Sequence, residues 1–196
     1  MINSDSYALW NSYLYQGTNV LINKFNAKNH KELHKIESRL ASIRIEELRK
    51  NPIKITGSKE LFTIHHHIFQ DSYEWAGKRR LVNMAKKNTS FAKTHEFDRI
   101  LQEIDKLIFE YKKITENNTL AISKKLAEIL DTINYLHPFR EGNGRTQREF
   151  LRALALEKNF ILDINPPDDE KIFKDYMTGT IYRYIDTLSL LINDCL

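Results

Sequence analysis

Apolar residues recur at helical spacing along most of this 196-residue chain, and this periodicity limits its fold more than any other feature. A residue that is apolar at every third or fourth position lies on one face of a helix, and that face packs on a core. The pattern covers residues 29–51, 58–69, 97–114, 120–136 and 145–159, and a last helical region occupies about 168–194. The spacing therefore predicts an all-α domain, a helical bundle.

The first long helix has marked ends. Asn29 followed by Glu32 is typical of a capping box, and Pro52 closes the segment. Its expected apolar face consists of Leu33, Ile36, Leu40, Ile43 and Leu48.

The helical period is lost between residues 71 and 94. The turn-forming triplets Trp75-Ala76-Gly77 and Lys86-Lys87-Asn88 flank short stretches there, which indicates one small β-hairpin and no other β structure.

Composition narrows the class of protein. The only cysteine is Cys195, so the chain can form no disulfide within itself, as is usual in a reducing compartment. The first residues lack the pattern of a signal peptide, and no run of eighteen apolar residues occurs. We expect one soluble, cytoplasmic domain over residues 1–196 that binds no membrane. A formal charge of +4 suits an anionic ligand but is too small to indicate nucleic-acid binding.

The chemistry is concentrated in residues 137–148, HPFREGNGRTQR, between two helical segments. Gly142, Asn143 and Gly144 can all adopt positive φ, which lets successive backbone N–H groups converge on one point. Such a group of N–H donors at the start of a helix binds anions. The segment is therefore a candidate phosphate site.

Charged side chains surround this site. Arg145 and Arg148 lie three residues apart on one helix face, and two guanidinium groups suit a polyphosphate. Glu141 would repel phosphate unless a cation lay between them, so it is a candidate Mg²⁺ ligand. His137 is the group here that can move a proton near neutral pH. These residues predict attack by a hydroxyl, deprotonated by His137, on a Mg²⁺-bound nucleotide phosphate.

Residues 137–148 resemble the motif of the Fic family, His-x-Phe-x-Asp/Glu-Gly-Asn-Gly-Arg-x-x-Arg, at every specified position. Residues 73–80, YEWAGKRR, resemble the start of the family's hairpin flap, and residues 13–21, YLYQGTNVL, resemble the opening of bacterial Fic toxins. The resemblance implies a Fic fold over the whole chain. It also implies a protein adenylyltransferase, which moves AMP from ATP to a Ser, Thr or Tyr hydroxyl of a target protein and releases pyrophosphate.

Roles follow from the resemblance, position by position. His137 is the general base, and Glu141 holds Mg²⁺. Gly142, Asn143 and Gly144 cradle the α- and β-phosphates, with a side-chain contact from Asn143. Arg145 holds the β-phosphate and Arg148 the γ-phosphate, while Phe139 anchors the loop in the core.

A target protein would dock on the flap, about Arg79 to Phe91, by main-chain strand addition. The residues expected to clamp it are Leu81, Val82, Asn83 and Met84. Many family members carry an inhibitory helix with the pattern Ser/Thr-x-x-x-Glu-Gly/Asn, of which the chain holds no good copy. The resemblance thus favours inhibition in trans by a small antitoxin, with a degenerate C-terminal helix as the alternative.

Two other functions stay open. Doc-type relatives transfer the γ-phosphate as protein kinases, and a third reading is an adaptor that binds nucleotide without turnover. Gly144 and the pair Arg145 and Arg148 favour adenylyl transfer over the kinase reaction. His137 with Glu141 favours an enzyme over an adaptor, which needs no base.

Elsewhere, His65-His66-His67 cannot form one metal site on a helix, because adjacent side chains point about 100° apart. At least one of the three should face the core.

Overall fold

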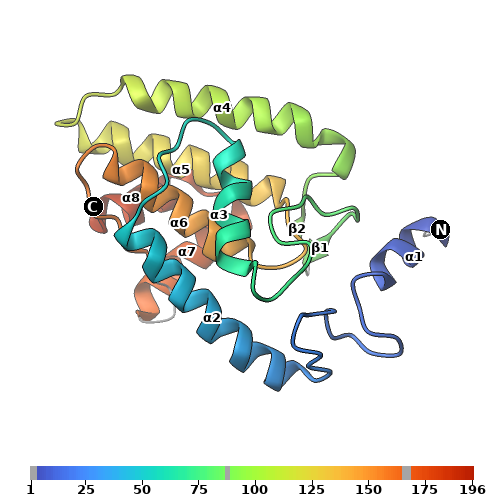
Figure 1. Cartoon of the computed structure of the whole chain (residues 1–196). Coiled ribbons are helices and arrows are strands. Elements are labelled where there is room, and N and C mark those ends of the chain that lie inside the picture. Colours follow the sequence, from blue (N-terminus) through green and yellow to red (C-terminus); the bar gives the residue numbers. More distant parts are fainter. Residues whose placement is uncertain (1–3, 87–88, 165–168) are drawn as a thin grey trace.

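The computed structural model describes residues 4–86, 89–164 and 169–196. Within these ranges the chain is mostly helical, as predicted (Figure 1). The α-helices are α1 (Ser4–Asn11), α2 (His30–Lys50), α3 (Lys59–Phe69), α4 (Phe97–Lys113), α5 (Thr119–Leu136), α6 (Asn143–Leu156), α7 (Glu170–Tyr182) and α8 (Ile185–Asp194), with a short 3-10 turn, η1, at Thr94–Glu96.

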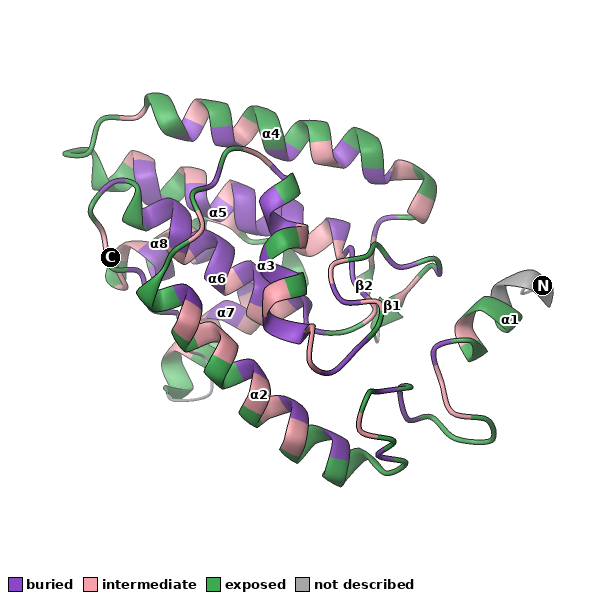
Figure 2. Ribbon diagram, viewed as in Figure 1, coloured by how far each residue is buried: buried purple, intermediate pink, exposed green. Residues whose placement is uncertain are grey.

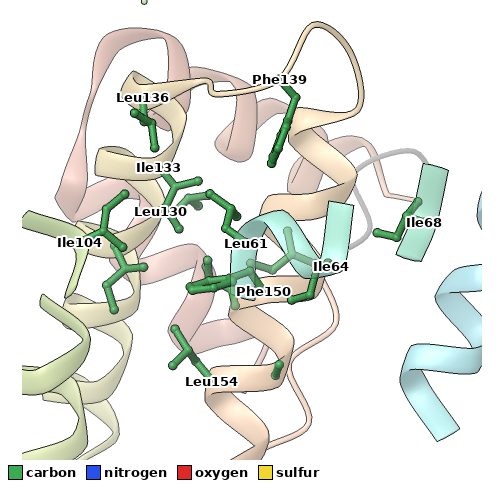
Figure 3. Close-up of a cluster of buried hydrophobic side chains, with 14 of the residues drawn as sticks. Leu61, Ile64, Ile68, Ile104, Leu130, Ile133, Leu136, Phe139, Phe150 and Leu154 are labelled. Atoms are coloured by element: carbon green, nitrogen blue, oxygen red, sulfur yellow. The ribbon is translucent and has the colours of Figure 1, made fainter. Parts of the chain in front are cut away.

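Helix α5 is the centre of the fold. It packs against α4, α6 and α8, and α3 covers α6 from the other side. Its residues from Leu126 onward are mostly buried, whereas α4 alternates buried and exposed faces (Figure 2). Side chains from α3, α4, α5 and α6 meet in one apolar cluster, and Phe139 closes it at the end where α5 runs into α6 (Figure 3). The core therefore fixes the loop that joins these two helices.

Helix α2 has the predicted ends but a different buried face. Asn29 caps it, accepting a hydrogen bond from the Glu32 N–H at 2.8 Å. Ile43, expected inside, is half exposed, and the buried positions include Leu33, Glu37 and Ala41. The expected apolar face is thus confirmed at Leu33 and Leu48 and wrong at Ile43, and the buried face includes a carboxylate, that of Glu37.

The β structure is smaller than predicted. Within the predicted flap, about residues 79–91, only two short strands pair: Ala85–Lys86 (β1) is antiparallel to Thr89–Ser90 (β2). Residues 79–84 are not strand. The polar groups of residues 79–84 bond instead to side chains and to the end of α5, as described below.

The predicted C-terminal helical region is two helices. Arg183, between α7 and α8, adopts a left-handed conformation with φ of 59° and ends α7. Its guanidinium pairs with the buried carboxylate of Asp131 on α5 at 2.6 Å, which holds the break in place. The predicted start at Asp168 lies outside the described residues.

Candidate active site

His137 ends helix α5 in a left-handed conformation, with φ of 43°. Few residues other than glycine adopt this geometry, so the surrounding contacts must hold it. The backbone N–H of His137 bonds to the Ile133 carbonyl at 3.0 Å. Its own carbonyl accepts a hydrogen bond from Nε of Arg80 at 2.8 Å. The chain direction is therefore fixed at the residue where the motif begins.

The imidazole of His137 is covered by an aromatic ring. Phe91 stacks on it with ring centroids 3.7 Å apart and an angle of 11° between the planes. Burial lowers the pKa of His137 to about 3; the Arg80 cation adds to the drop, and the backbone of Asn134 partly opposes it. The ring is therefore neutral near pH 7, the form that can accept a proton.

Asn143 closes the loop between the two helices. Its side-chain oxygen accepts the Phe139 N–H at 3.0 Å, and its side-chain nitrogen donates to the Phe139 carbonyl at 2.8 Å. The amide is buried, and its oxygen and nitrogen each have a partner inside the loop. The expected side-chain contact from Asn143 to phosphate stays a prediction, and the backbone N–H of Asn143 lies at the start of α6.

The first turn of α6 supplies a set of backbone donors. The first helical bond is made by Thr146, whose N–H donates to the Gly142 carbonyl at 3.1 Å. The N–H groups of Asn143, Gly144 and Arg145 precede it and have no acceptor within the helix. Of the predicted run of positive φ, only Gly142 shows it, at 83°; Asn143 and Gly144 are already helical. The donors thus converge because they form one helical turn.

Arg145 and Arg148 lie where the sequence predicts, both lining a cavity of about 600 Å³ between α2 and the motif loop. Arg145 forms an ion pair with Glu37 of α2, Nη1 to Oε1 at 2.6 Å, and its guanidinium lies over the Phe69 ring. Arg148 makes no ion pair with any described residue and lies over Tyr176 at 5.9 Å. One arginine is thus held by carboxylate and ring, and the other faces the cavity with its charge uncompensated.

Glu141 lies between these groups and solvent. Its carboxylate is about 50% exposed, lines the same cavity and accepts the Gly142 N–H at 3.0 Å. Gly142 therefore donates to Glu141 and does not take part in the open set of donors. A half-exposed carboxylate beside this cavity is the hard oxygen ligand that Mg²⁺ prefers, so the donor fits this metal.

The predicted docking residues do not all face outward. Leu81 is 59% exposed, whereas Val82 is buried and packs inside the segment. The side chain of Asn83 accepts the Thr94 N–H at 3.0 Å, and Met84 is half-buried against the core. Val82 is therefore wrong as a surface residue, because its side chain is buried and its carbonyl accepts a hydrogen bond from the buried Arg80 side chain.

Sequence reasoning missed Glu37, Tyr73 and Phe91. The hydroxyl of Tyr73 donates to Glu37, so that carboxylate joins Tyr73 to Arg145. One signal was present in the sequence: Glu37 stands four residues after Leu33 and four before Ala41, which places a charge on a buried helix face. The contacts of Phe91 depend on how residues 81–92 fold, and nothing in the sequence pattern indicated them.

Comparison with known proteins gives one family. The model described as "Fic/DOC family" matches residues 54–155. The protein adenylyltransferase VbhT of Bartonella schoenbuchensis is 33% identical over 89% of this chain, which spans 37% of the length of VbhT. The probable protein adenylyltransferase y4lH of Sinorhizobium fredii is 35% identical over 76% of this chain and 77% of its own.

A solved structure has the same fold. The BepC protein of Bartonella tribocorum, crystallised with bound AMPPNP, superposes with a TM-score of 0.81 over 94% of this chain and 96% of its own, at 20% identity. This likeness concerns the fold alone.

Proposed function

Because this chain belongs to the Fic/DOC family and is a protein adenylyltransferase, we propose that it moves AMP from ATP to a Ser, Thr or Tyr hydroxyl of a target protein and releases pyrophosphate. The proposal rests above all on one juxtaposition: a neutral histidine at the end of α5, and the open N-terminal turn of α6 six residues later. BepC, the fold neighbour, was crystallised with AMPPNP, which supports ATP as the nucleotide.

The phosphates would bind at the start of α6. The backbone N–H groups of Asn143, Gly144 and Arg145 and the positive end of the helix dipole favour negative charge there. Arg145 would contact the β-phosphate with the donors that Glu37 leaves free, and Arg148 would contact the γ-phosphate.

His137 would act as general base. The target hydroxyl loses its proton to the imidazole while its oxygen attacks the α-phosphorus; the bond from that phosphorus to the bridging oxygen breaks, and pyrophosphate leaves. The low pKa of His137 keeps the ring unprotonated and ready to accept. Because Phe91 covers the ring, it must shift or guide the hydroxyl past its edge.

Mg²⁺ would be held by Glu141 together with the phosphates. When bound, the ion neutralises phosphate charge and removes the repulsion between the nucleotide and this carboxylate. Glu141 is able to reach it because its carboxylate lines the cavity and is half exposed.

The target would dock on residues 79–91 by main-chain pairing along β1, whose two residues are exposed. Leu81 would supply a side-chain contact beside it. We further propose that residues 1–196 form one Fic domain that works in the cytoplasm and that a small antitoxin inhibits it in trans. In the described part of the chain, no helix combines the length and apolarity that crossing a bilayer requires.

The decisive experiment uses ATP labelled at the α- or, separately, the γ-phosphate. Wild type, His137→Ala and the control His95→Ala, which removes an exposed histidine from η1, are each incubated with bacterial lysate and Mg²⁺. Protein labelled from the α-position only, lost in His137→Ala and kept in the control, is the expected result. Label from the γ-position only would identify a Doc-type kinase. No label from either position, with the protein purified free of any inhibitor, would identify a silent or non-catalytic member of the family.

A further inference from the structure

His65 is joined by both ring nitrogens to the loop around the site. It lies on α3 with no exposed surface. The Gly77 N–H donates to its Nδ1 at 2.8 Å, and its Nε2 lies 3.0 Å from the Glu141 carbonyl oxygen. Because Nδ1 accepts, the ring proton is on Nε2 and is donated to that carbonyl. The two bonds define one tautomer.

The ring of His65 is also fixed by packing. Phe139 of the motif stacks on it, with centroids 3.7 Å apart and an angle of 18° between the planes. Burial lowers the pKa of His65 to about 3, so it stays neutral. A second ring proton would point at the Gly77 N–H, donor against donor, which disfavours the charged form on geometric grounds as well.

Helix α3 also packs against the peptide that joins Glu141 to Gly142. Phe69, one turn after His65 on α3, fills the space that a side chain at Gly142 would need. His65 holds the carbonyl of residue 141, Phe69 packs on residue 142, and α6 begins at residue 143. Helix α3 thereby sets the direction in which the first N–H groups of α6 point.

We propose that His65 is a positioning residue for the phosphate site: by holding the Glu141 carbonyl, it orients the first turn of α6 toward the nucleotide. This rests on the proposed function, in which that turn binds ATP. The residue touches neither the nucleotide cavity nor His137. Of the histidine triplet, His66 is exposed and His67 lies 3.1 Å from Glu47, so this role belongs to His65 alone.

The test measures ATP affinity by titration calorimetry with Mg²⁺, alongside thermal unfolding. His65→Phe keeps a ring stacked on Phe139 and removes both hydrogen bonds; we expect ATP to bind about tenfold more weakly. His65→Gln keeps one donor for the carbonyl but loses the stacked ring, so we expect about a threefold loss. His66→Phe changes the exposed neighbour and serves as the matched control, with affinity unchanged.

A merely structural role would lower the melting temperature and leave the ATP dissociation constant of the folded protein as it was. Wild-type affinity in whichever His65 variant folds overturns the proposal. Absence of ATP binding by the wild-type chain would instead count against the proposed function, so the two failures are distinguishable.

Discussion

Gly142 and Gly17 share a backbone conformation but not an environment. Their φ angles are 83° and 73°, in the region that glycine tolerates and other residues avoid. A side chain at Gly142 would overlap the ring of Phe69, whereas nothing lies within 4 Å of one at Gly17. Substitutions at these two glycines therefore distinguish the free-energy cost of backbone strain from that of a steric clash.

Gly142→Ala should destabilise the fold by about 3 kcal/mol, since strain of about 1 kcal/mol adds to an overpacked contact. It should also weaken ATP binding, because Phe69 and the start of α6 must move apart. Gly17→Ala carries the strain alone, about 1 kcal/mol, with ATP binding unchanged. Urea unfolding and calorimetry measure both quantities. Equal losses of stability in the two variants would contradict the packing described at Gly142.

At the scale of single residues, the sequence predicted which side chains gather at the site but not how each is used. Glu141, Arg145 and Arg148 line one cavity because one loop and one helical turn carry them, and His137 precedes that loop without lining the cavity. The use of the Asn143 amide inside the loop depends on the path of that loop. Contacts such as that of Glu37 with Arg145 depend on how distant helices pack, which local spacing does not encode.

Among the elements, the segment between α3 and α4 is held by one buried cation. The Arg80 side chain donates to the carbonyls of Val82 and Ala92, two positions of this segment that are far apart in sequence. It also donates to the carbonyls of Leu136 and His137 at the end of α5. The backbone N–H of Arg80 bonds to the Pro138 carbonyl at 2.7 Å. Burial lowers the pKa of Arg80 to about 10, so it remains charged near neutral pH.

Arg80→Met should therefore destabilise the protein by about 3 kcal/mol or more, because several buried carbonyls lose their donor together. Amide hydrogen exchange should rise throughout residues 81–92. Arg79→Met is the matched control: this neighbour makes an ion pair with Asp98 in which both side chains are more than half exposed, so its loss should change little. Similar exchange in the two variants would show that Arg80 does not hold the segment.

The elements that sequence predicted best are those whose ends carry a local signal. Asn29 caps α2 as predicted, and α5 begins at Thr119, one residue before its predicted start, with Asn118 as its cap. The break at Arg183 was missed, since a long-range bond to Asp131 determines it, and the predicted hairpin is reduced to the short β1–β2 ladder beside the bonds around Arg80. α1, a short helix of eight residues, was also not predicted.

For the molecule as a whole, two buried neutral histidines make stability depend on pH. The pKa of both His65 and His137 is lowered to about 3, whereas an unfolded chain protonates histidine near 6.5. Between these values the unfolded state binds more protons than the folded state. Stability is therefore fully present above about pH 6.5 and is lost as the pH falls toward 3.

Each histidine should contribute a slope of up to about 1.4 kcal/mol per pH unit in this window. Urea unfolding between pH 6.5 and 4.5 measures it, before the carboxylates titrate. His65→Phe and His137→Ala should each reduce the slope, and His95→Ala, at an exposed position, should leave it unchanged. A slope unaffected by either buried substitution would mean that these rings are protonated in the folded state.

The paired bonds between Asn143 and Phe139 make the loop a closed ring of backbone and side chain, with His137 at one end and the helical turn at the other. Such a ring keeps the distance constant between the proton acceptor, His137, and the backbone donors that would contact phosphate. Under the proposed function, changes at the exposed positions of the outer segment, such as Leu81, would alter the contact with a target and leave this spacing unchanged. Changes at Arg80 or Phe91 would alter both, because these residues contact His137.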